Sequence, residues 1–199
     1  MTPGIEKLTH DSEILTAMAS EMDSYLKSDV LFWNLSAPGM PRLTLGGYLL
    51  REHRLLALLD WLDASTRAQV ETAVIQFNQA LVEKIVRFEQ KAHVELEARL
   101  RQWREFLRDV EQGAARQRSN YATAVEPRAM LAALIARLEM PPYRLQPEPV
   151  AQLAALDAQL RRVWEAGDFI WPEEWQPAYP RAAYWWLYGQ PKEKPRPEA

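Results

Sequence analysis

The longest regular pattern in this chain lies between Ala64 and Gly113. Apolar side chains recur there about every 3.6 residues, which is the period of a straight α-helix. Ser65 and Thr66 can cap its start, Gly113 can end it, and no Pro or Gly interrupts it. The pattern therefore predicts one continuous helix over residues 65–113, roughly 70 Å long. Its apolar stripe consists of Val70, Val74, Phe77, Leu81, Ile85, Phe88, Ala92, Leu96, Leu100, Trp103, Leu107 and Val110.

Shorter amphipathic patterns flank this segment on both sides. Each repeats its apolar residues at helical spacing, and residues such as Thr44 and Pro127 mark where a helix begins. Gly46 and Gly47 are poor helix formers, so their place in a first turn predicts the close approach of another backbone. The predicted helices cover approximately residues 9–28, 44–63, 126–139, 149–166 and, as a short one, 180–188.

These patterns determine the expected fold class. Seven Gly residues in a chain of 199, against many Ala, Leu, Arg and Glu, favour helix over strand. We expect an all-α protein, in which residues 9–189 form a single bundle of about five helices around the long central helix. Residues 1–8 are expected to be flexible, and the Lys, Glu and Pro residues of 190–199 predict a disordered tail.

Aromatic residues and prolines are interleaved near the C-terminal end of the chain. Five of the eight Trp residues lie between Trp164 and Trp186. Rings with one polar edge suit sugar stacking or a membrane interface, although Asp168 and Glu173 would repel anionic lipids. The alternative is that the segment packs across the helices and closes their open face, because large aromatic side chains are usually buried. The candidate residues are Trp171, Trp175, Tyr184, Trp185 and Trp186.

Composition narrows the classes of function. A formal charge of −3 provides no overall field that attracts nucleic acid or an anionic membrane. The absence of Cys excludes disulfides, thiolate zinc sites and a cysteine nucleophile. Residues 1–8 lack the pattern of a signal peptide, and no apolar run reaches the roughly 20 residues of a membrane span. We therefore expect a cytoplasmic protein that does not contact membranes.

An arginine-rich stretch at the end of the long helix raises the question of nucleic-acid binding. Glutamates alternate with these arginines, and pairs such as Glu95 with Arg99 and Glu97 with Arg101 are typical of intrahelical ion pairs on a solvated face. Nucleic acid is therefore not an expected partner. The arginines in question are Arg99, Arg101, Arg104, Arg108, Arg116 and Arg118.

Three ionisable residues fall on or beside the apolar stripes. Glu52 lies among the inward leucines of 44–63, while Glu89 and His93 share one face of the long helix. Such groups can form a metal or acid–base site inside a bundle, although Glu-x-x-x-His differs from the Glu-x-x-His of ferritin-like sites. The alternative is that both glutamates pair with arginines of neighbouring helices. His53 adjoins Glu52 but points about 100° away from it. No metal ion or other cofactor is expected.

A break rich in turn residues follows the first predicted helix. It combines the apolar residues Trp33 and Leu43 with polar ones, which indicates a loop that packs against the helices. Polar recognition groups are often mounted on such loops. Asn34, Ser36 and Arg42 are therefore candidate ligand contacts.

Protein–protein contact is the function that these patterns favour. The apolar stripe of the long helix is longer than the neighbouring helices can cover, so a partner protein or a second copy in a homodimer would cover the rest. A monomer that covers the stripe with its own helices is the other arrangement. We expect a non-catalytic interaction, scaffold or regulatory protein. The alternative is a ligand-binding or metal-dependent helical-bundle enzyme that uses Glu52, Glu89 and His93.

Overall fold

A computed structural model describes residues 2–112 and 120–192 and is mostly helical, which confirms the all-α class. One two-stranded ribbon accompanies the helices. The helices are α1 (Pro3–Lys27), α2 (Leu45–Ala57), α3 (Ala64–Val82), α4 (Ile85–Glu111), α6 (Tyr121–Ala124), α7 (Glu126–Leu138) and α8 (Pro147–Arg162). The strands are β1 (Trp164–Phe169) and β2 (Tyr188–Pro191), and the 3₁₀ turns are η1 (Leu59–Trp61), η2 (Glu173–Ala178) and η3 (Trp185–Leu187).

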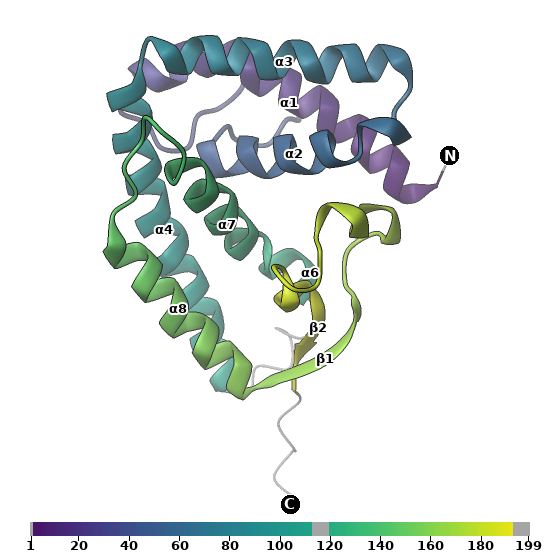
Figure 1. Ribbon diagram of the computed structural model, residues 1–199, viewed down its shortest axis with the longest axis vertical. Helices are drawn as coiled ribbons and strands as arrows, with labels where there is room; N and C mark the ends of the chain where they lie inside the picture. The colour runs from purple at the N-terminus through teal and green to yellow at the C-terminus, as the bar shows by residue number, and fades with distance from the viewer. Residues whose placement is uncertain (1, 113–119, 193–199) are drawn as a thin grey trace, which may run out of the picture.

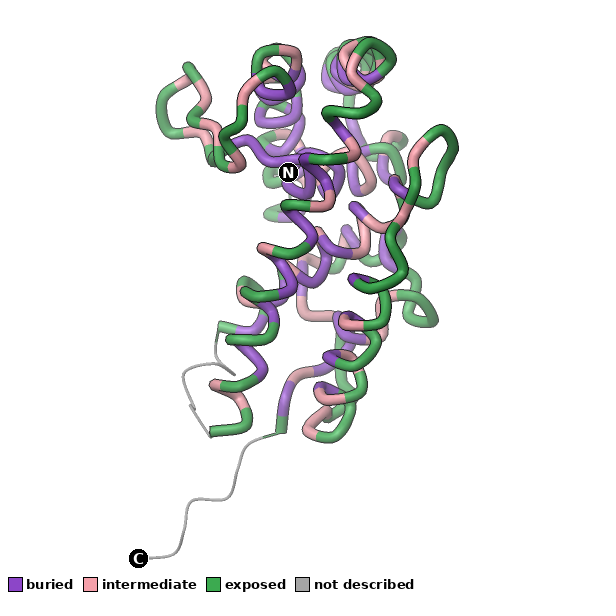
Figure 2. The backbone as a smooth tube through the Cα atoms, turned by 90° about the vertical axis from the view of Figure 1, so that its left-hand side faces the viewer, coloured by how far each residue is buried: buried purple, intermediate pink, exposed green. Residues whose placement is uncertain are grey.

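The helices form two groups that meet at α2 (Figure 1). Helices α1, α2 and α3 pack together in one group, while α4 packs on α7 and α8 in the other; α2 also contacts α7 and α4. Residues 164–192, here called the C-terminal segment, fill the space below α2 and beside α6. Buried residues lie on the inward sides of the helices (Figure 2). The largest fully buried side chains include Tyr25, Tyr48, Phe77, Phe88, Trp103, Tyr121, Tyr179 and Trp186.

The expectation of one continuous helix over 65–113 is wrong. Helix α3 ends at Val82 and α4 begins at Ile85, because Lys84 leaves the helical conformation with φ −134° and ψ 34°. The Lys84 ammonium pairs with the Asp23 carboxylate of α1, which holds the corner. Each half then packs on different neighbours within the chain.

The break also removes the argument for a partner along the stripe. Most stripe residues of α3 and α4 are buried against the chain's own helices, with Ile85 at the corner as the exposed exception. The apolar residues of the sequence keep their helical spacing across the corner, because the break between the two helices is only two residues long. Because the stripe is covered by the chain itself, it no longer supports self-association.

Helix α1 begins at Pro3, so the prediction of a flexible segment before residue 9 is wrong for residues 3–8. Hydrogen bonding to Thr2, and to the backbone of Gly4, lowers the pKa of the Glu174 carboxyl. Trp175 Nε1 donates to the Gly4 carbonyl oxygen at 3.1 Å. The C-terminal segment thus packs against the first turn of α1.

The predicted C-terminal helices are also corrected. Instead of a helix over 149–166, α8 ends at Arg162 and β1 follows; instead of a helix over 180–188, a turn, η3 and the start of β2 are present. Strands β1 and β2 pair antiparallel, with Glu165 opposite Gln190 and Ala166 opposite Gly189. Gln190 and Pro191 therefore belong to a strand, and residues 193–199 of the expected tail lie outside the described residues.

Gly189 is required by the ribbon. Its φ of 137° is unfavourable for other residues, and an added Cβ would overlap the Glu165 carbonyl oxygen. Gly189→Ala should lower the free energy of unfolding by on the order of 1–3 kcal/mol in urea titrations. Gly167→Ala is the matched control, because its Cβ would meet its nearest neighbour at an ordinary 3.5 Å. Equal losses in the two variants would contradict this account of the ribbon.

The start of α2 is hydrogen-bonded to a buried ion pair on α4, formed by Glu95 and Arg99. Thr44 Oγ1 accepts from the Gly47 amide at 3.0 Å, and Glu95 Oε2 accepts from the Gly46 amide at 3.0 Å. Arg99 donates to Glu95 Oε1 through two N–H groups, both at 3.1 Å. This pair is buried, so its predicted place on a solvated face is wrong. A Cβ on Gly46 would lie 2.8 Å from Glu95 Oε1 and 3.0 Å from the Cβ of Met130, so side chains approach this glycine closely, instead of the backbone that the sequence predicts.

Candidate functional site

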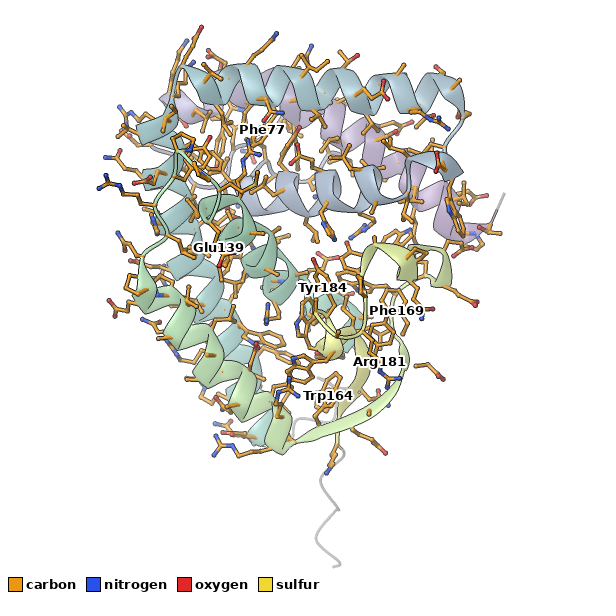
Figure 3. The ribbon with its side chains drawn as sticks, in the orientation of Figure 1. Phe77, Glu139, Trp164, Phe169, Arg181 and Tyr184 are labelled. Atoms are coloured by element: carbon orange, nitrogen blue, oxygen red, sulfur yellow. The ribbon has the colours of Figure 1, made fainter. Side chains whose placement is uncertain are left out.

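A hollow of about 210 Å³ lies between α2 and α7, closed at one end by the C-terminal segment. We call it the α2/α7 groove. Tyr184, labelled in Figure 3, reaches it from the C-terminal segment. Its polar lining comes from Glu52, His53, Arg137, Tyr179 and Tyr184. Its apolar lining comes from Leu49, Leu50, Leu56, Ala129, Ala132, Ala133, Ala136 and Met140.

Helical spacing explains why these residues share one groove. On α2, Leu49, Glu52, His53 and Leu56 follow one another at steps of three, one and three residues, and so lie along one face. On α7 the facing positions 129, 132, 133 and 136 are all alanine. Methyl groups are too short to fill the space between two helices, and a hollow remains.

Glu52 is the unusual group in the groove. Its carboxyl is half-buried, and no residue of the described part of the chain donates a hydrogen bond to it. Burial raises the pKa of Glu52 to about 7, while the charge of Arg137 acts in the opposite direction. Arg137 is itself held elsewhere, because its Nη2 donates to Asn78 Oδ1 at 2.8 Å. Glu52 thus lacks the direct ionic partner that buried carboxylates normally have.

His53 is oriented by the C-terminal segment. Its Nε2 lies 2.8 Å from the Ala178 carbonyl oxygen and 3.3 Å from the Tyr184 hydroxyl. A carbonyl can only accept, so Nε2 carries the proton and Nδ1 of the neutral ring carries a lone pair. Burial lowers the pKa of His53, which keeps the ring neutral at pH 7. The Tyr184 hydroxyl in turn keeps its own hydrogen free to donate.

Glu89 and His93 do not join Glu52. Glu89 Oε2 accepts from the Arg144 amide at 2.8 Å, and His93 Nε2 donates to the Arg144 carbonyl at 2.9 Å. Together they bind the backbone amide and carbonyl of Arg144, which lies in the loop between α7 and α8. The predicted cavity shared by Glu52, Glu89 and His93 is therefore wrong. In residues 2–112 and 120–192, no group of three or more His, Asp or Glu side chains is placed to hold a metal ion.

The loop candidates Asn34, Ser36 and Arg42 are exposed. Glu21 of α1 fixes this loop, accepting from Trp33 Nε1 at 2.8 Å and from the Ser36 amide at 2.7 Å. These two hydrogen bonds, from Trp33 first, lower the pKa of Glu21. Of the three candidates, Ser36 is thus engaged through its backbone in holding the loop.

The aromatic candidates separate into two groups. Trp171, Trp175 and Trp186 are buried, and Trp171 Nε1 donates to the Ala122 carbonyl oxygen at 2.7 Å. Trp185 is half-buried, with the Arg161 guanidinium 3.8 Å above its ring. The buried rings have no free face for a sugar, while Tyr184 contributes to the α2/α7 groove.

Sequence reasoning found Glu52 but missed most of its surroundings. His53 lines the same groove as Glu52 despite the predicted separation of about 100°, because a groove between two helices is wide enough for adjacent residues. The four alanines of α7 were the available signal. Small residues at helical spacing indicate a helix face whose side chains are too short to fill the space against a neighbouring helix.

Outside the groove, the arginines of the predicted basic stretch differ in burial: Arg101, Arg104 and Arg108 are exposed on α4, whereas Arg99 is not. Arg99 is buried on Glu95, and Arg104 donates to Gln152 Oε1 of α8 at 3.1 Å. Arg116 and Arg118 lie outside the described residues.

Over the described residues, no helix is long and apolar enough to cross a membrane. Compared with protein-family models, curated proteins and solved structures, the chain matches none of them.

Proposed function

We propose that this chain is a non-catalytic interaction protein that docks a segment of a partner protein on the α2/α7 groove. The observation that carries the proposal is the combination of the groove with an apolar rim. Leu56 is 42% exposed on one side and Met140 is 54% exposed on the other. Large apolar side chains beside a concave site favour protein contact over solvent exposure.

The chemistry of the groove supports binding more than catalysis. The Nε2 proton of His53 is committed to the Ala178 carbonyl oxygen. Glu89 and His93, the other groups considered for acid–base work, hold Arg144. The alanines of α7 offer an apolar surface that suits the stem of an inserted side chain.

The test is selection of binding peptides from a random displayed library, with variants that fill or spare the groove. Ala136 lies exposed at the groove, so Ala136→Trp should fill it; Ala155, exposed on α8, gives the matched control Ala155→Trp. Selected peptides should lose at least about tenfold in affinity on Ala136→Trp, because an anchor can no longer be buried. They should bind the Ala155→Trp variant as well as the unmodified chain.

Equal melting temperatures of the two variants would show that both remain folded. The proposal would be overturned if the selected peptides bound the Ala136→Trp variant with unchanged affinity, or if no peptide could be selected. A small molecule that binds the groove when no peptide does would favour the ligand-binding alternative instead.

A further inference from the structure

The proposed function leaves open which group of the partner enters the groove. Resting on that function, we propose that the anchor is a lysine side chain, with its four-carbon stem against the alanines of α7 and its ammonium on the Glu52 carboxylate. The groove offers the two features that such a side chain needs, an apolar wall and an unpaired carboxylate.

The charges around Glu52 leave room for one cation. The groups that face it are His53 and Tyr48 on α2, Arg137 on α7 and Tyr184 from the C-terminal segment. The histidine and both tyrosines are uncharged at neutral pH, since burial lowers the pKa of His53 and raises those of the tyrosines.

Arg137 is the cation already present, and its geometry shows that it does not neutralise Glu52. Its Nη2 bonds to Asn78, and its guanidinium lies 5.6 Å from the ring centre of Phe77 and 5.8 Å from that of Tyr143. Desolvation therefore outweighs the charge of Arg137 at Glu52. An ammonium brought into the groove would supply the missing partner.

Lysine fits better than arginine for a stereochemical reason. A guanidinium binds best to a carboxylate that is open along both oxygens, whereas an ammonium is a compact donor of three hydrogen bonds. The groove lining supplies acceptors of different kinds, including the Glu52 carboxylate and the Tyr184 hydroxyl oxygen. An ammonium can turn its three donors toward such a set, whereas the donors of a guanidinium are fixed in one plane.

Binding of an ammonium by Glu52 should depend on pH in a fixed direction. The carboxylate form binds the cation, and with a pKa of about 7 it becomes depleted as the pH falls. Affinity should therefore drop about tenfold between about pH 8 and about pH 6. Protonation of His53 at still lower pH would repel the cation and act in the same direction. A ligand that accepted a hydrogen bond from protonated Glu52 would show the opposite dependence.

The experiment compares two probes with the same stem on the full chain, followed by NMR. The probes are Nα-acetyl-lysine methylamide and Nα-acetyl-norleucine methylamide, which lacks the ammonium. At about pH 8 the lysine probe should bind at least about tenfold more tightly and shift the Tyr184 and His53 resonances. This preference should disappear on Glu52→Gln and remain on Glu71→Gln, an exposed control on α3.

Two results would overturn the lysine anchor. One is equal binding of the two probes at about pH 8, and the other is lysine binding that survives Glu52→Gln or strengthens as the pH falls. If the library peptides respond to Ala136→Trp but lack lysine and ignore Glu52→Gln, the docking function stands and this inference fails. If neither peptides nor probes respond to Ala136→Trp, both proposals fail.

Discussion

Trp186→Ala is expected to lower the free energy of unfolding by about 3–5 kcal/mol. The side chain is 0% exposed, and its ring contacts Tyr184 with centroids 5.6 Å apart. The Arg128 guanidinium lies 4.7 Å from the ring centre on the side of α7. Removal of the indole leaves a cavity between the C-terminal segment and α7. The walls cannot close on it, because Tyr121 on α6 is held to the Trp186 carbonyl oxygen at 2.8 Å.

Trp185→Ala is the matched control for this prediction. The two residues are adjacent and of the same type, but Trp185 is only half-buried and stacks under Arg161. Its loss should cost clearly less, on the order of 1 kcal/mol. Urea denaturation followed by circular dichroism at 222 nm measures both without relying on tryptophan fluorescence. A melting temperature of Trp186→Ala equal to that of the unmodified chain would rule out the packing role of this segment.

Glu95→Ala should cost about 3–5 kcal/mol, because it leaves the guanidinium of Arg99 buried without its counter-charge. Glu95 is 0% exposed and also accepts the Gly46 amide at the start of α2. The substitution therefore removes an ion pair and a helix cap at once. Equilibrium unfolding in urea gives the change.

The matched controls for Glu95 are a solvent-exposed glutamate and a double variant. Glu97 lies two residues away on an exposed face of α4. Glu97→Ala should therefore change the free energy of unfolding by less than about 0.5 kcal/mol. The double variant Glu95→Ala with Arg99→Ala should cost less than the sum of the two single variants, because each single variant strands the other charge. Strict additivity would contradict a coupled buried pair.

The elements that local sequence describes well were predicted well. Helix α7 was expected over 126–139 and covers Glu126–Leu138, because Pro127 in its first turn and Pro141 and Pro142 beyond its end mark it locally. Thr44 was expected to cap α2, and its hydroxyl does accept the Gly47 amide. Glu52 was picked out because a charge among leucines stands out from its neighbours.

The failures share one physical cause, which is dependence on distant residues. The corner at Lys84 is stabilised by Asp23, and the first turn of α1 by Glu174. Strand β1 exists because residues 188–191 pair with it. None of these partners is visible within a window of one or two helical turns. The groove escaped prediction for the same reason, since it needs α2, α7 and Tyr184 together.

The contact between Trp175 and Gly4 has a consequence for the time course of folding. The two residues are separated by 171 positions, so the beginning of α1 acquires its contact with the C-terminal segment only after the chain has emerged from the ribosome as far as residue 175. Contacts of such long sequence separation slow folding, because a large loop must close before they stabilise anything. On a ribosome-bound chain that stops before η2, the Gly4 amide, which depends on Glu174, should exchange with solvent faster than it does in the full chain.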